Sequence, residues 1–145
     1  QQTIAQRAAA DNVSAKRQNW IDELRKDMSE FLTVMARLNE LRRPTTGISK
    51  EDEAKNFDDM AMRNFRATEL GIRIRLRLNP NEEEHNKLVS LIRELSDASV
   101  DPPPNETPEQ GEAAKRAFHG ARDKVVAHMQ KLLKHEWERV KKGVV

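Results

Sequence analysis

The feature that most constrains this chain is a long stripe of large apolar residues at helical spacing in residues 20–41. Its members recur every three or four residues, and charged side chains occupy the other side of the same segment. They are Trp20, Leu24, Phe31, Met35 and Leu38, widened by Ile21, Met28 and Val34. Because such a helix is stable only when its apolar side is covered, the rest of the chain is expected to pack on it.

Three later segments carry amphipathic patterns of their own, and local signals mark where each begins. Ser49 can cap a second helix. Asn81 can cap a third, with Glu84 completing an arrangement like a capping box. Thr107 followed by Pro108 is typical of the start of a fourth. The expected helices span about residues 5–43, 50–78, 81–96 and 108–142.

The composition favours an all-helical fold. Charged residues make up 34% of the 145 residues and hydrophobic residues 37%, a balance that suits helices that each bury one side. Aromatic residues reach only 4%, which argues against a β-sandwich or barrel. We therefore predict an all-α fold, a four-helix, mostly antiparallel bundle with an extended N-terminal helix.

The first helix is expected to extend beyond the rest of the bundle. It would be about 60 Å long at 1.5 Å per residue, which exceeds the diameter of a compact domain of this size. Its first part has too few large apolar residues to bury one side. We expect residues 1–19 to form a helical lead-in or stalk and residues 20–145 to form the bundle domain.

The second helix contains a segment, residues 70–78, whose strict alternation of apolar residues and arginines leaves both helix and strand open. Helix is favoured because a lone strand would leave its backbone groups unpaired. As a helix, residues 60–78 carry two apolar stripes on nearly opposite sides. One stripe is Ala61, Phe65, Ile72 and Leu76, and the other includes Met60, Ala67, Leu70, Ile74 and Leu78. Leu70, Ile74 and Leu78 are our candidates for binding a partner.

Arginines on one flank of the second helix provide an alternative function. Arg66, Arg73 and Arg77 could contact a partner beside the apolar stripe or bind phosphate groups. The alternative is therefore a small nucleic-acid-associated protein that uses these three residues. The formal net charge is only +2, and nearby acidic residues favour intramolecular ion pairs, so nucleic acid is the less expected partner.

No pattern in the sequence is typical of a catalytic or cofactor site. The chain has no cysteine, no serine in a nucleophile-elbow motif and no glycine-rich phosphate loop. Glu82 and His85 have the Glu-x-x-His spacing of di-metal bundles, but the second copy that such sites require is missing. The sequence therefore indicates a protein that is not an enzyme and needs no cofactor or metal.

Arg17 lies inside the apolar stripe of the first helix, one turn before Trp20. A covered arginine needs a carboxylate or a backbone oxygen as its partner. Glu136 of the last helix, next to Trp137, is a candidate for that partner. Arg17, Trp20, Glu136 and Trp137 are therefore predicted to form a structural clamp.

Three segments together carry a family resemblance. They are Arg17-x-x-Trp20-Ile21, then Leu78-Asn79-Pro80-Asn81 followed by His85, and Lys134-x-Glu136-Trp137-Glu138-x-Val140-Lys141. This combination resembles a group of uncharacterised bacterial proteins, often encoded in phage-related regions, in which an N-terminal transmembrane helix leads into a domain of this kind. The group implies no catalytic residues.

The resemblance also implies a location and a role. The full-length protein is expected at the cytoplasmic face of a bacterial inner membrane, attached through a helix that precedes Gln1, while the fragment itself is expected to be soluble. The expected function is a non-enzymatic interaction or scaffold domain. A homodimer is the simplest form of that interaction, and an unidentified protein is the other expected partner.

Overall fold

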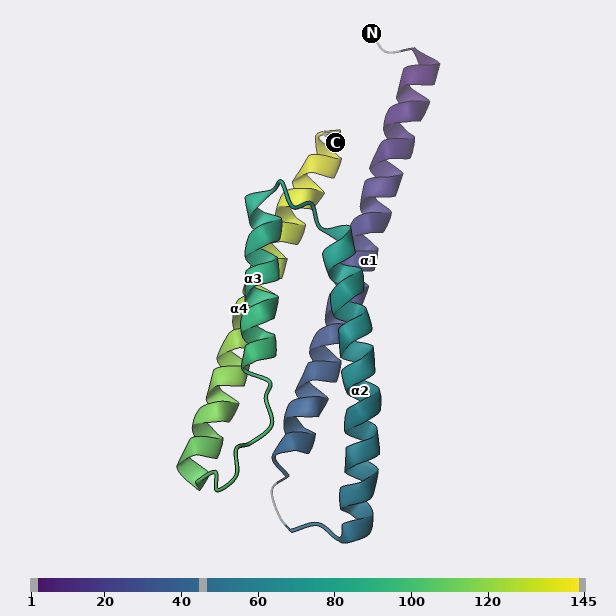
Figure 1. Ribbon diagram of the computed structural model, residues 1–145. Coiled ribbons are helices and arrows are strands. Elements are labelled where there is room, and N and C mark those ends of the chain that lie inside the picture. The colour runs from purple at the N-terminus through teal and green to yellow at the C-terminus, as the bar shows by residue number, and fades with distance from the viewer. Residues whose placement is uncertain (1–2, 45–46, 144–145) are drawn as a thin grey trace.

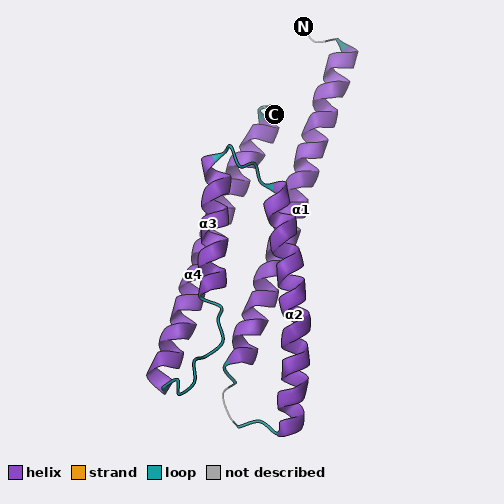
Figure 2. Cartoon of the chain, viewed as in Figure 1, coloured by secondary structure: helices purple, strands orange, loops and turns teal. Residues whose placement is uncertain are grey.

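Four helices and no strands make up the part of the chain that the computed structural model describes, residues 3–44 and 47–143 (Figures 1 and 2). The helices are α1 (Ile4–Arg42), α2 (Lys50–Arg77), α3 (Glu83–Asp97) and α4 (Pro108–Lys141). Successive helices run in opposite directions (Figure 1), which confirms the predicted all-α, antiparallel bundle. The predicted domain ranges also include residues 1–2, 45–46 and 144–145, which lie outside the described residues.

The starts of two helices agree with their sequence signals, and the start of a third differs. The Ser49 side chain caps α2 by accepting from the Asp52 backbone N–H, and Thr107 forms a capping box with Gln110 at the start of α4. The predicted Asn81 cap is wrong, because α3 begins at Glu83 without a side-chain cap. The Asn81 backbone N–H instead donates to the Asn79 side chain at 3.0 Å, which holds residue 81 in the preceding turn.

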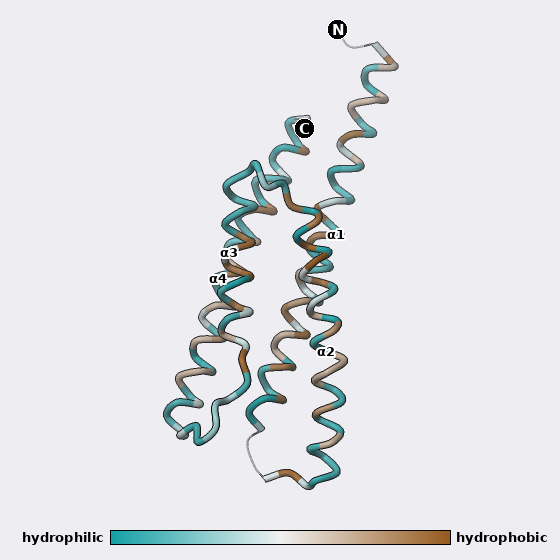
Figure 3. Tube along the Cα trace, viewed as in Figure 1, coloured by the Kyte–Doolittle hydropathy of each residue, from teal (hydrophilic) through white to brown (hydrophobic). Residues whose placement is uncertain are grey.

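The core lies between α1 and the helices on either side of it. α1 packs against both α2 and α4, and α3 packs against α4, whereas α2 and α3 approach each other much less closely. Hydrophobic residues recur along all four helices rather than gathering in one of them (Figure 3). The largest fully buried apolar side chains are Ile21, Leu24, Leu38, Leu70, Ile74, Leu88, Leu95, Phe118, Val125 and Leu132.

The segment with alternating arginines is helical, in agreement with the favoured prediction. α2 continues without interruption to Arg77, and Leu70 and Ile74 are completely buried on its inner side. Residues four apart lie on one side of a helix, so these two side chains pack together on α1.

The N-terminal part of α1 projects beyond the other helices (Figure 1). The helix has 39 residues, and its first buried residue is Ile21. Residues 3–13 are all exposed, whereas Arg17, further along α1, already pairs with Glu136 of α4. This overhang is therefore held in place by its own backbone hydrogen bonds and by the continuity of the helix.

Candidate functional sites

The outer side of α2 carries large apolar side chains that no other helix covers. Phe65 is 84% exposed and Leu76 is 82% exposed, and Ile72 between them is also exposed. We call this set the outer stripe of α2; it consists of Phe57, Met62, Phe65, Ile72 and Leu76. Exposed apolar residues gathered on one side of a helix are typical of a surface that binds another protein.

Met62, Phe65, Ile72 and Leu76 of the outer stripe lie on the opposite side of α2 from the expected partner-binding residues, whereas Phe57 lies nearer the end of α1, beside Leu41 and Pro44. Leu70, Ile74 and Leu78 are buried in the core and cannot contact a partner while the bundle is folded. The sequence correctly shows that α2 has two apolar sides. The prediction of which side binds a partner is wrong, because the side with Leu70 and Ile74 packs in the core. The side that includes Phe65 is the one that is free.

The arginine strip of α2 is engaged with acidic residues of α1. Arg77 Nε donates to Asp27 Oδ2 at 3.0 Å, and Arg73 Nη1 lies 3.5 Å from Asp27 Oδ1. Arg66 forms ion pairs with Glu30 and with Glu69. Binding a phosphate group here would require these pairs to be given up, so the geometry favours the intramolecular role of the strip.

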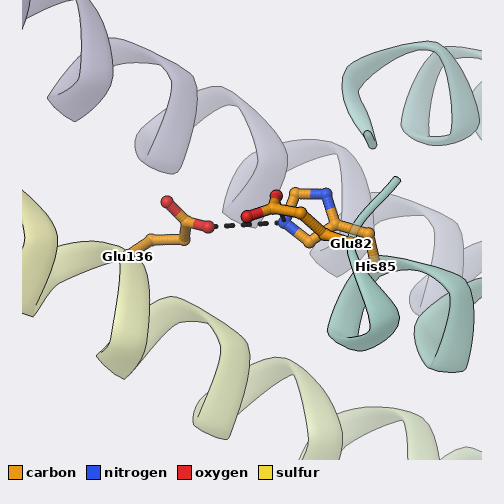
Figure 4. A group of neighbouring side chains, drawn as sticks. All are labelled: Glu82, His85 and Glu136. Atoms are coloured by element: carbon orange, nitrogen blue, oxygen red, sulfur yellow. Dashed lines mark hydrogen bonds and ion pairs between the residues drawn. The ribbon is translucent and has the colours of Figure 1, made fainter. Parts of the chain in front are cut away.

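A cluster of charged and polar side chains lies at the end of the bundle where the α1 overhang begins. Glu136 of α4 is 1% exposed and forms an ion pair with Arg17 of α1. His85 and Glu82, from the start of α3, lie beside Glu136, and Figure 4 shows these three side chains pointing toward one another. The predicted pair of Arg17 with Glu136 is thus present, inside a larger group that we call the buried polar cluster.

The hydrogen bonds of His85 fix which ring nitrogen carries the proton. The Asn79 backbone N–H donates to His85 Nδ1 at 2.8 Å, so Nδ1 is an acceptor and the neutral ring carries its proton on Nε2. Nε2 lies 3.1 Å from Glu82 Oε2 and 3.3 Å from Glu136 Oε1. The ring therefore joins the turn after α2 to the carboxylates of α3 and α4.

The buried polar cluster contains the one group of side chains within the described residues that has metal-ligand spacing. Ligand atoms of Glu82, His85 and Glu136 all lie within 4.8 Å of one another. However, Arg17 and Arg139 already neutralise the two carboxylates, and His85 directs an N–H rather than a lone pair at them. A divalent cation would be repelled by both guanidinium groups, so the chemistry of this set favours a structural network.

The two tryptophans of the predicted clamp behave differently. The Trp20 ring stacks on His85 with centroids 5.7 Å apart, and its Nε1–H donates to the Arg77 carbonyl oxygen at 2.9 Å. Trp137 is 42% exposed and contacts Lys141 instead. The prediction that Trp137 belongs to the clamp is therefore wrong. The three segments that carry the family resemblance thus meet around the buried polar cluster, with Trp137 on the outside.

Comparisons with known proteins assign no family. No family model, curated protein or solved structure matches the chain. Among the described residues, no helix is both long enough and apolar enough to cross a membrane. The outer stripe and the buried polar cluster must therefore be interpreted from their own chemistry.

The carboxyl group of Glu82 predicts a dependence of stability on pH. Donation from Arg139 is the main cause that lowers the pKa of Glu82 below its usual 4.5, and the positive charges of Arg139 and Arg17 lower it further, while burial acts in the opposite direction. Glu82 therefore stabilises the fold fully above its unfolded pKa, and that contribution is lost as pH falls through the lower folded pKa. We expect the difference in unfolding free energy between wild type and Glu82→Gln to shrink as the pH falls below about 4.5.

Chemical denaturation at several pH values measures this effect. Glu83→Gln is the matched control, because Glu83 is adjacent to Glu82 at the start of α3 and is exposed. Its effect on stability should be small. A difference for Glu82→Gln that is constant with pH would contradict the prediction.

Proposed function

We propose that this protein is a non-enzymatic interaction domain that binds a second copy of itself through the outer stripe of α2. The observation that supports this proposal most directly is the exposure of Phe65, Ile72 and Leu76 on one side of a well-packed helix. Transfer of such side chains from water to an interface is favourable by about 1.5–3 kcal/mol each. A scaffold role needs only such a surface and no reactive group.

The charges of α2 favour a second copy in the antiparallel orientation. Acidic residues outnumber basic residues in residues 50–63, and basic residues outnumber acidic residues in residues 64–77. Among the described residues Arg75 has no carboxylate partner, and the other arginines of that half pair with acidic residues of α1. An antiparallel pair of α2 helices places the acidic half of each helix against the basic half of the other. A parallel pair would place like charges together, which is destabilising.

The spacing of the outer stripe is compatible with this orientation. In an antiparallel pair, Phe65 can lie opposite Ile72 of the second copy, while Ala61 lies opposite Leu76. A small residue opposite a large one allows the two helices to approach closely along their length. The same contacts then occur twice, as two-fold symmetry requires.

Sedimentation equilibrium over a wide range of protein concentrations tests the proposal. The apparent mass should rise from 16.7 kDa toward twice that value as concentration increases. Phe65→Glu should weaken association at least about a hundredfold, because symmetry removes two apolar side chains from the interface and adds two carboxylates.

Ile4→Glu is the matched control for this experiment. Ile4 is 85% exposed, like Phe65, but lies at the tip of the α1 overhang. This variant should associate as the wild type does. A protein that stays monomeric at the highest concentration, or a Phe65→Glu variant that associates as strongly as wild type, would exclude self-association through this stripe.

Attachment to a bacterial membrane stays a prediction that rests on the family resemblance. The α1 overhang suits the role of a spacer, because residues 4–13 are helical and exposed. Fractionation of cells that express the gene from its native start codon decides this point. Recovery in the soluble fraction would remove the tether and leave the proposed self-association unaffected.

A further inference from the structure

A groove separates α2 from α3, the neighbouring helices that approach each other least closely. Its volume is about 340 Å³, within the range of sites that bind small molecules. Phe31 and Met35 of α1 line it, together with Ala67 from α2 and with Val89 and Ile92 from α3. The groove is distinct from the outer stripe and from the arginine strip, which lie on other sides of α2.

Three arginines also line the α2–α3 groove, one from each of the helices that form it. They are Arg42, Arg75 and Arg93. Arg75 Nε donates to the Gly71 carbonyl oxygen at 3.3 Å, and Glu94, next to Arg93 in sequence, pairs with Lys124. Within residues 3–44 and 47–143, neither Arg75 nor Arg93 has a carboxylate partner, so the groove has uncompensated positive charge.

Arg42 supplies the observation that points to a ligand. Its side chain is 9% exposed; Nε donates to Asp101 at 3.2 Å, and Nη2 donates to Asn64 at 3.3 Å. The third nitrogen, Nη1, is buried and has no hydrogen-bond partner in the part of the chain that the structure describes. A buried donor without an acceptor is costly, and a ligand oxygen would provide the acceptor.

We propose that the α2–α3 groove binds a small amphipathic carboxylate, such as a medium-chain fatty acid. The apolar chain would lie over Phe31 and Met35, which form the base of the groove, so that its own methylene groups leave water. The carboxylate would accept from Arg42 Nη1 and lie close to Arg75 and Arg93. A carboxylate oxygen can accept from the one nitrogen of Arg42 that has no partner among the described residues, and the positive charges of Arg75 and Arg93 favour an anion beside it.

Isothermal titration calorimetry with decanoate tests the proposed ligand class. Decanoate should bind saturably with one molecule per chain. Acetate keeps only the carboxylate and decanol keeps only the apolar chain, so each should bind at least about tenfold more weakly. Equal affinity for decanol would show that the groove selects apolar chains without regard to charge, and would overturn the proposal of an anion site.

Two variants test the location of the site. Gly71 lines the groove, and a Cβ added there would make an ordinary van der Waals contact with Phe31, 3.7 Å from its Cε1, so a leucine can be placed at the groove wall without a backbone clash. Gly71→Leu should therefore weaken decanoate binding at least about tenfold. Gly120→Leu is the control, because Gly120 also lies within a helix and a Cβ added there would meet nothing within 4 Å; it should bind as wild type does.

Arg93→Gln keeps the experiment decisive if Gly71→Leu disturbs the fold. Arg93 is exposed, so this variant should keep the helical circular dichroism of the wild type while decanoate binding weakens about threefold or more. The proposal fails if decanoate shows no saturable binding at millimolar concentration. It also fails if a folded Gly71→Leu protein and Arg93→Gln both bind decanoate as tightly as wild type.

Discussion

Ile74→Glu is expected to unfold the bundle or to lower its unfolding free energy by more than about 3 kcal/mol. Ile74 is completely buried on the inner side of α2, where a carboxylate would lose its water and gain no cation. Leu76→Glu, two residues further along, should change the same free energy by less than about 0.5 kcal/mol, because Leu76 is exposed. Urea denaturation followed by circular dichroism measures both values.

Ile74→Val separates the effect of charge from the effect of lost volume. Removal of one buried methylene group should cost only about 0.5–1.5 kcal/mol. If Ile74→Glu and Leu76→Glu had equal unfolding midpoints, the sides of α2 would be assigned incorrectly, and the interface proposed on the outer stripe would lose its basis.

Replacement of Glu136 by alanine should destabilise the fold by about 3–5 kcal/mol, the usual effect of breaking a buried ion pair. The change leaves Arg17 without its carboxylate and removes one acceptor beside His85 Nε2. Glu112→Ala is the control on the same helix, because Glu112 is exposed and its ion pair is with Lys115, one turn away. It should change stability by less than about 0.5 kcal/mol.

A double-mutant cycle shows whether the loss arises from the ion pair itself. Arg17→Met and Glu136→Leu should each be strongly destabilising, whereas the double variant should lose much less than the sum, because two apolar side chains can pack where two charges were. Losses that add without coupling would show that Arg17 and Glu136 act independently, and would contradict the structural clamp.

The fold could be predicted because its signals are local. The apolar stripe of residues 20–41 and the caps at Ser49 and Thr107 each depend on residues a few positions apart. The Asn81 cap is absent for a local reason as well. The turn before α3 contains both Asn79 and Asn81. The Asn79 side chain accepts a hydrogen bond from the Asn81 backbone N–H, and this bond holds Asn81 in the turn rather than at the helix cap.

The functional side of α2 could not be chosen from its own sequence, because both of its sides are apolar. In the structure the side with Leu70 and Ile74 faces the core, and Arg66 and Arg77 pair with Glu30 and Asp27 of α1. The acidic residues on one flank of the first helix were therefore a usable signal for which side of α2 faces α1.

The buried polar cluster was only partly visible in the sequence. The spacing of Glu82 and His85 places both side chains at the start of one helix, and Arg17 stood out within an apolar stripe. Their meeting with Glu136 joins positions about 50 and 119 residues apart, and only the packing of α1 and α3 on α4 brings them together. No pattern in the sequence predicts the α2–α3 groove, because the groove exists only where α2 and α3 do not pack closely against each other.

The overhang of α1 gives the proposed dimer a definite polarity. In a single chain, the overhang projects from the end of the bundle where α2 finishes (Figure 1). In two chains joined antiparallel along α2, the two overhangs therefore project from opposite ends of the dimer. Whatever is attached to the two N-termini would be held apart at a fixed separation, so the assembly would act as a cross-bridge between two objects and could not gather both on one side.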